Sequence, residues 1–224
     1  MHDTYDAIIV GSGAAGGWAA RQLTAGGLDV LVLEAGRAVT PERDYPVPAP
    51  PRRRMSGRAW RALTGQHVQA RGFGFDETTR HFFVDDRENP YTTPAGRPYL
   101  WFRGRQVGGR LHTWARVVFR LSDAELKAAS VDGHGVDWPI SYDDLSPWYD
   151  EVETFLGVEG SDDGIATLPD SRYVGARSLN RAEQAFSQAV EQTFPDRRVI
   201  TTRVVRQRRD RVIPTLEAAA RTGH

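Results

Sequence analysis

The chain has 224 residues, with 29 basic and 29 acidic side chains and a formal net charge of zero at neutral pH. Balanced charge provides no global field that would recruit nucleic acid or an anionic membrane surface. The absence of cysteine excludes disulfides, thiolate metal sites and flavin enzymes that work through a cysteine pair.

The apolar runs are strand-sized, far below the roughly 20 residues that cross a bilayer, so we expect no transmembrane segment. The first strand begins almost at the N-terminus and leaves no room for a signal peptide. We therefore expect a cytoplasmic chain, with export alongside a partner subunit left open.

Residues 5–16 (YDAIIVGSGAAG) combine a short apolar run with a glycine fingerprint. The run is typical of a strand buried in a parallel sheet. Gly11 allows a tight turn, Gly13 lets backbone approach a pyrophosphate, and Gly16 lets the next helix press against the strand. The helix expected at 14–25 offers its N-terminus to the phosphates.

A second strand is expected at residues 30–33, and Glu34 follows it. A carboxylate at that position accepts the hydroxyls of an adenosine ribose and repels a 2′-phosphate, which argues against an NADP-type ligand. The pattern predicts dinucleotide binding and leaves NAD and FAD open. The alternative is a structural βαβ unit without a ligand.

Residues 37–137 are rich in proline, glycine, arginine and aromatic residues and show little periodicity. The stretch 46–54 (PVPAPPRRR) cannot form a helix or a central strand, so we expect an exposed or partner-facing loop rather than a nucleic-acid patch. Core packing, rather than stacking on a sugar, is the expected role of most of the aromatic side chains Tyr99, Trp101, Phe102, Trp114 and Trp138.

Residues 101–116 (WFRGRQVGGRLHTWAR) contain a second motif that a plain NAD-binding domain does not need. The Gly108-Gly109 backbone can lie flat against a planar ligand or its pyrophosphate. Two arginines, Arg103 and Arg105, are available to phosphate or to a ring carbonyl. His112, Thr113 and Trp114 can supply a hydrogen bond, a hydroxyl and a stacking wall. The alternative is a glycine turn between two strands with the arginines in solvent.

The C-terminal part is predicted to be mostly helical. Residues 141–156 have helix-start signals at Ser141 and at Ser146-Pro147, and Gly157 ends the helix. A capping box at 180–183 begins a second amphipathic helix that ends near residue 194. We expect a strand at 199–205 and a helix at 214–221.

The remaining acidic and histidine residues favour structural roles. The pairs at 85–86 and 143–144 are adjacent acids that point in different directions, and residues 162–164 are expected to form a turn because other calcium ligands are missing. The six histidines lack metal-ligand spacing, so we predict no metal site.

Three segments together resemble the glucose–methanol–choline oxidoreductase family: the fingerprint, residues 104–110 (GRQVGGR) and residues 137–149 (DWPISYDDLSPWY). They are most similar to its bacterial sugar-dehydrogenase and pyranose-oxidase-like branch, over essentially the whole chain. The resemblance implies FAD rather than NAD. It implies an α/β fold, namely a Rossmann-like FAD-binding domain that is incomplete and carries irregular and helical insertions.

By this resemblance the chain divides into a βαβ start (1–36), FAD-covering loops with the Gly-Gly flavin motif (37–137), and a helical segment leading into the substrate part (138–224). The fingerprint glycines would hold the pyrophosphate and Glu34 the ribose, while the second motif would lie beside the flavin. The expected cofactor-binding set is Gly11, Ser12, Gly13, Ala14, Ala15, Gly16, Glu34, Ala35, Arg103, Gly104, Arg105, Val107, Gly108, Gly109, His112, Thr113 and Trp114.

The chain departs from the family pattern in two places. Many members read Gly-Gly-Ser-Ser where this chain has Gly-Gly-Arg-Leu, which keeps backbone contacts but not hydroxyl contacts. Pyranose oxidases carry a covalent flavin link on a His-Trp pair, and here Thr113-Trp114 occupies those positions. We therefore predict non-covalent FAD.

The implied activity is FAD-dependent oxidation of a CH–OH group of a sugar, glycoside or other alcohol, with hydride transfer to flavin N5. Family members are more than twice this size, and we expect their catalytic histidine pair beyond His224. We thus predict no catalytic residue in this chain and no activity for it alone, with an electron-acceptor or export subunit as a possible partner. The alternatives are an inactive truncated product that retains nucleotide binding or an interaction role, and an NAD-dependent dehydrogenase domain.

Overall fold

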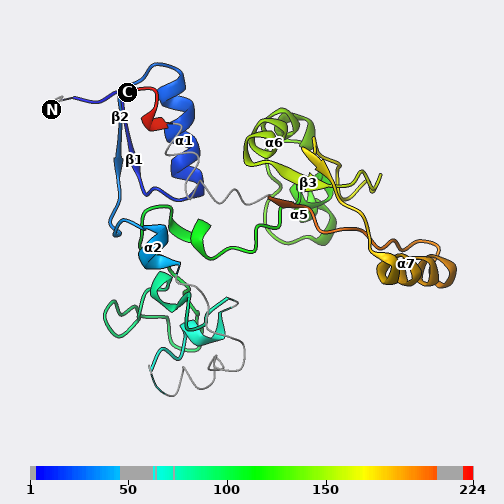
Figure 1. The fold of residues 1–224 in the computed structure, drawn as a ribbon, viewed down its shortest axis with the longest axis horizontal. Helices are drawn as coiled ribbons and strands as arrows, with labels where there is room; N and C mark the ends of the chain where they lie inside the picture. The colour runs from blue at the N-terminus through cyan, green and yellow to red at the C-terminus, as the bar shows by residue number, and fades with distance from the viewer. Residues whose placement is uncertain (1–3, 46–62, 64, 73, 206–218, 224) are drawn as a thin grey trace. The chain divides into compact units, whose positions relative to one another are not determined.

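The computed structural model describes residues 4–45, 63, 65–72, 74–205 and 219–223 (Figure 1). The expected loop at 46–54 and most of the expected helix at 214–221 lie outside these residues. Backbone contacts divide the chain into a first unit, Met1–Trp114 with Arg209–His224, and a second unit, Ala115–Arg208. These boundaries differ from those of the three regions expected from the sequence.

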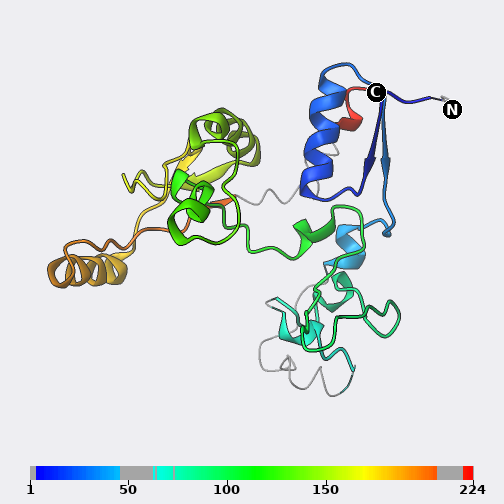
Figure 2. The same ribbon diagram turned by 180° about the vertical axis from the view of Figure 1, so that it is seen from behind.

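The first unit begins with a βαβ motif made of β1 (Ala7–Val10), α1 (Ala14–Ala25) and β2 (Val30–Leu33). The two strands are parallel, in a register that runs from Ala7 opposite Val30 to Val10 opposite Leu33. Figures 1 and 2 show α1 running alongside the strand pair. The predicted α/β start, with its right order of strand, helix and strand, is confirmed.

One face of this sheet is uncovered. Ile8 is 61% exposed and Val10 is 85% exposed, because alternate side chains of β1 point away from α1. Within the described residues the sheet contains only β1 and β2. The expectation of a buried strand was therefore wrong for Ile8 and Val10.

The rest of the first unit is built from short helical turns around a small aromatic core. These are α2 (Pro41–Asp44), η2 (Gln69–Arg71), η3 (Arg80–Phe82) and η4 (Gly109–His112). The core consists of Phe75, Phe82 and Phe83, with Val39 and Ala70 packed against it. The second motif contacts this core through His112, whose ring stacks on Phe82.

Some of the aromatic residues expected in the core are at the surface instead. Tyr99 is 64% exposed, Trp101 46% and Trp138 61%. Trp101 lies under the guanidinium of Arg103, whose carbon is 4.6 Å from the ring centroid. For these three side chains the core-packing expectation was wrong, and the Trp101 ring serves as a partner for a cation.

The second unit contains α4 (Asp123–Leu126), α5 (Ala128–Asp132), α6 (Tyr142–Leu156), β3 (Val158–Gly160), β4 (Gly175–Ala176), α7 (Arg181–Thr193) and β5 (Val204–Val205). Its sheet has the order β4-β3-β5, with β3 parallel to β4 and antiparallel to β5. Among the described residues, no helix of either unit is both long and apolar enough to cross a membrane.

The helix ends predicted at Ser141, Gly157 and Asn180 are confirmed, whereas the start signal at Ser146-Pro147 lies inside α6. Ser141 and Asn180 are the N-caps of α6 and α7, and each forms a capping box with an acidic residue three positions on. Gly157 ends α6 with a φ of +74°. The strand expected at 199–205 is only Val204–Val205, because its partner β3 is itself three residues long.

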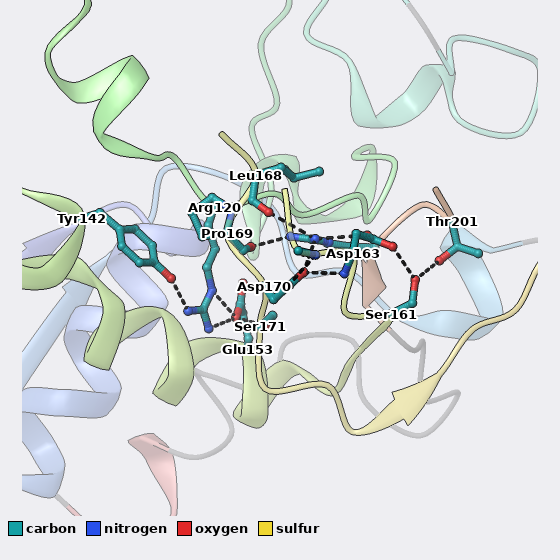
Figure 3. A network of polar contacts seen from close by, with 12 residues as sticks. Arg120, Tyr142, Glu153, Ser161, Asp163, Leu168, Pro169, Asp170, Ser171 and Thr201 are labelled. Atoms are coloured by element: carbon teal, nitrogen blue, oxygen red, sulfur yellow. Dashed lines mark hydrogen bonds and ion pairs between the residues drawn. The ribbon is translucent and has the colours of Figure 1, made fainter. Parts of the chain in front are cut away.

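Two buried arginines hold the second unit together (Figure 3). Arg203 is 1% exposed and its guanidinium lies 2.9 Å from Asp170 and 3.2 Å from Asp163. Arg120 is 4% exposed and donates to Glu153 and to Asp150. Asp163, in the segment expected to be a turn, is thus an ion-pair partner.

Replacing Arg203 tests how far the stability of the second unit depends on the ion pairs of Arg203 with Asp163 and Asp170. We expect Arg203→Met to destabilise the second unit by about 3–5 kcal/mol, since it leaves two carboxylates without their cation. Arg197→Met is the control, because Arg197 is 72% exposed and lies 3.8 Å from an equally exposed Asp196. Urea unfolding of the full chain measures both. An equal loss of unfolding free energy in the two variants would contradict a structural role for the Arg203 ion pairs.

Candidate functional site

The turn after β1 is shaped by its glycines. Gly11 has a φ of +94°, and its amide donates to the carbonyl of Leu33 over 2.7 Å, which joins the turn to β2. A Cβ on Gly16 would lie 1.9 Å from the carbonyl oxygen of Gly11. Only glycine fits there, so α1 can begin directly against the turn.

The N-terminus of α1 has no side-chain cap among the described residues. Gly13 is the N-cap, and the first turn of the helix contains no acid. A Cβ on Gly13 would meet nothing within 4 Å. The amides at this end, which include those of Ala14 and Ala15, have no partner within the helix, and together with the helix dipole they favour an anion.

Glu34 lies beside the turn and is held there as a carboxylate. It accepts hydrogen bonds from the Ser12 amide (3.0 Å), from the Ser12 hydroxyl and from the Gly36 amide (2.7 Å). Burial raises the pKa of the Glu34 carboxyl, but these hydrogen bonds outweigh burial and hold the pKa below its ordinary value. The side chain is therefore ionised at neutral pH.

The second motif docks on the end of β2 through its backbone. Arg37 and Gln106 form a parallel bridge, and the Val107 amide donates to the Arg37 carbonyl over 2.9 Å. A Cβ on Gly36 would lie 2.2 Å from the backbone nitrogen of Gln106. Segments that are 70 residues apart in the sequence can therefore meet only because residue 36 is glycine.

The Gly108-Gly109 turn then lies on the fingerprint. Its two glycines have φ angles of +87° and +54°. A Cβ on Gly109 would be 3.2 Å from the Cα of Gly13, and the Gly108 amide donates to the Ser12 hydroxyl over 3.0 Å. Gln106 braces the turn from within by donating its side-chain amide to the Gly109 carbonyl over 2.9 Å.

His112 supports the same turn with both ring nitrogens. Its Nε2 lies 2.8 Å from the Val107 carbonyl, which can only accept, so Nε2 carries the hydrogen. Nδ1 then accepts the hydrogen bond of the Tyr45 hydroxyl. Phe82 stacks on the imidazole with centroids 5.1 Å apart. Burial lowers the pKa of His112, which keeps it neutral at pH 7.

The two arginines of the motif are engaged by side chains of the same unit. Arg103 lies 3.0 Å from Asp86, and Arg105 donates to the side-chain oxygen of Asn89 over 3.1 Å. The alternative of a plain turn between strands with arginines in solvent does not describe this segment, since the helical turn η4 follows the glycines. Arg105 also lines a cleft of about 620 Å³, together with Gln106 and Phe82.

The structure thus brings most of the predicted cofactor-binding set together at one place. Gly11 to Gly16, Glu34 and Ala35 meet the segment from Val107 to His112, while Arg103 is directed toward Asp86. Gly104 precedes the docked segment. The Thr113 amide donates to the Arg110 carbonyl over 3.0 Å, and its hydroxyl makes a longer hydrogen bond of 3.4 Å to the same carbonyl. Trp114 is half-buried.

Sequence reasoning missed the residues that brace this site from elsewhere in the chain. Tyr45 contacts His112 of the second motif, and Asp44, 3% exposed, pairs with Arg37 and Arg43. Within the motif itself, the bracing of Gly109 by Gln106 was also missed. The Thr40-Pro41 pair is a helix-start signal that could have placed the short α2. Nothing in the sequence pattern relates Tyr45 to His112.

Gly36→Ala tests the docking of the second motif. We expect a destabilisation of about 1–3 kcal/mol or more, because the new Cβ overlaps the backbone of residues 105–106. Gly26→Ala is the matched control, since that Cβ would lie 3.3 Å from the nearest atom at a φ of −79°. Thermal unfolding compares the two. An undiminished melting temperature for Gly36→Ala would show that residues 105–107 do not pack there.

The chain was compared with family models, curated proteins and solved structures. No family model matches it. It is 29% identical over 160 residues to the 2-methyl-1,2-propanediol dehydrogenase of Mycolicibacterium austroafricanum, a match that covers 70% of this chain and 25% of that protein. It is 30% identical over 161 residues to the fructose dehydrogenase large subunit of Gluconobacter japonicus, covering 69% and 27% respectively.

Two further matches are of the same kind. Paromamine 6′-oxidase of Streptomyces fradiae is 28% identical over 166 residues, which are 71% of this chain and 24% of that protein. The solved pyridoxine 4-oxidase from Mesorbium loti has a TM-score of 0.44 at 21% identity, covering 91% of this chain and 37% of that chain. The chain spans about a quarter of the length of these curated relatives. The curated proteins that the chain resembles over about 70% of its length are oxidoreductases of the glucose–methanol–choline type.

Proposed function

We propose that this chain binds FAD and forms the cofactor-binding part of an oxidoreductase that acts on a CH–OH group of a sugar, glycoside or other alcohol. The observation that carries the proposal is the docking of the Gly108-Gly109 turn on the fingerprint, with a Cβ on Gly109 3.2 Å from Gly13. This contact makes one backbone-lined site from two motifs. The matched relatives, whose names describe dehydrogenases and oxidases, support the same reading.

The residues present fit the adenosine diphosphate half of the cofactor. The uncapped start of α1 provides amides for a pyrophosphate, and the open space at Gly13 leaves room for it. Glu34 is ionised and held at the end of β2, where it can accept a ribose hydroxyl. The three fingerprint glycines and the acidic residue after the second strand are all present in this sequence.

The second motif would hold the flavin half. Its backbone at Gly104 and 107–109 is proposed to lie against the cofactor, with Thr113 and Trp114 beside the ring and Arg105 at the neighbouring cleft. When bound, FAD supplies the hydride acceptor of the reaction. The neutral His112 keeps the turn in position through Val107 and holds no charge near the ring.

We propose that the FAD is bound without a covalent link. A histidyl link needs a free ring nitrogen, and in His112 both nitrogens are hydrogen-bonded, one to Val107 and one to Tyr45. The neighbouring Thr113 and Trp114 offer no nucleophile of that kind. This agrees with the absence of histidine at the position used by pyranose oxidases.

We propose that the general base and the groups that choose the substrate are not among the residues of this chain. We place the base beyond the residues of this chain, since the chain spans about a quarter of the relatives' length. The fructose dehydrogenase relative is by its name one subunit of a larger enzyme. We therefore propose a partner subunit that accepts electrons or assists export as one arrangement in which this chain works.

Cofactor binding is tested by expressing the full chain and recording its absorption spectrum after addition of FAD. We expect bound, oxidised flavin at about one per chain, and release of that flavin into the supernatant on acid precipitation. Flavin in the precipitate would contradict non-covalent binding. A folded, monodisperse chain that binds no FAD would contradict the proposal itself.

A second candidate is nucleotide binding without turnover, which the short span relative to the relatives favours. Anaerobic addition of sugars and alcohols to the FAD-loaded chain alone and to the complete enzyme separates the two. We expect the flavin to stay oxidised with this chain alone and to be reduced only in the complete enzyme. Preference for NAD over FAD in a competition assay would instead support an NAD-dependent domain.

A further inference from the structure

Ser12 lies at the centre of the candidate site, yet its side chain is turned inward. The residue is 2% exposed. Its hydroxyl donates to Oε2 of Glu34 and accepts the amide hydrogen of Gly108 over 3.0 Å. A hydroxyl has a single hydrogen, so the direction of both bonds is fixed: Gly108 donates to Ser12, and Ser12 donates to Glu34.

This chain of hydrogen bonds ends on a charge. Hydrogen bonds to a carboxylate are about twice as strong as neutral ones, and successive bonds polarise one another. The Ser12 hydroxyl therefore links the ribose-binding carboxylate at the end of β2 to the Gly108-Gly109 turn, 96 residues away from it in the sequence. No other described side chain contacts both Glu34 and the turn in this way.

We infer that Ser12 is a positioning residue that acts through Glu34, and that its hydroxyl has no contact with the ligand. It holds the carboxylate ionised and oriented for the adenosine ribose while fixing the turn for the rest of the dinucleotide. The inference rests on the proposed function, and it assigns to Ser12 a role different from that of the glycines beside it.

The role predicts a change in pH dependence that a purely structural role would not give. In the wild type, ribose binding by Glu34 is present above its lowered pKa and is lost as the pH falls through that value. Without the Ser12 hydroxyl the Glu34 carboxyl loses the side-chain hydrogen bond that lowers its pKa, so its pKa rises toward the ordinary range. The loss of affinity at acid pH therefore moves to higher pH in Ser12→Ala.

The experiment measures ADP binding by titration calorimetry on the full chain between about pH 4 and about pH 8. We expect Ser12→Ala to weaken ADP binding about tenfold at neutral pH. We also expect the loss of ADP affinity on acidification to occur at a higher pH in this variant than in the wild type. Titration of the ADP phosphate is the same for every variant and cancels in the comparison.

Ser122→Ala is a matched control. The Ser122 hydroxyl also donates to a glutamate, Glu125 at 2.6 Å, and accepts a backbone amide, that of Ala124 at 3.2 Å. The residue is 4% exposed and belongs to the second unit. We expect this variant to lose similar stability and to bind ADP as the wild type does.

Glu34→Gln decides whether Ser12 acts through the carboxylate. In that background Ser12→Ala should weaken ADP binding by less than about threefold, since the charged acceptor is gone. The inference would be overturned if Ser12→Ala weakened ADP binding by the same factor with Glu34 and with Gln at position 34. It would also be overturned if the pH at which ADP affinity is lost were the same in Ser12→Ala and the wild type.

A ligand-free measurement separates failure of the inference from failure of the proposed function. The carboxyl ¹³C shift of Glu34, followed by NMR against pH, should show a higher pKa in Ser12→Ala than in the wild type and no change in Ser122→Ala. Wild-type chain that is folded but binds neither ADP nor FAD would contradict the proposed function. An unchanged Glu34 pKa would contradict the role of Ser12 whatever the chain binds.

Discussion

The candidate site depends on a close approach of two backbones. Residues 105–107 lie beside the end of β2, and the Gly108-Gly109 turn lies on Gly13. Side chains at positions 36 and 109 would overlap or crowd the opposite backbone, so the approach is possible only with glycine at these positions. Hydrogen bonds through Gln106, Ser12 and His112 fix the turn once it is there.

This arrangement separates charge in a way that suits a dinucleotide. The start of α1 carries the positive end of the helix dipole and no acid in its first turn, while the ionised Glu34 lies at the end of β2, where the proposed function puts the ribose. Between them the contacts are made by backbone and by neutral side chains, His112 among them. In the proposed site, phosphate and ribose would therefore each meet a partner of suitable polarity.

Local features of the fold could be read from the sequence, and distant contacts could not. The βαβ start and the caps at Ser141 and Asn180 follow from residues within a few positions of one another, so the pattern predicts them. The exposure of Ile8 and Val10 depends on which distant segments pack against β1. The direction of the Arg103 side chain depends on its ion pair with Asp86. The bracing of His112 by Tyr45 joins residues with no shared motif.

The central claim is that the fingerprint and the Gly108-Gly109 turn form a single binding site. Hydrogen–deuterium exchange of the full chain, with and without FAD, tests it directly. The account predicts that FAD slows exchange in residues 11–16 and in residues 107–110 together, and leaves α7 unchanged. Protection confined to residues 11–16, with no change at the turn, would contradict it.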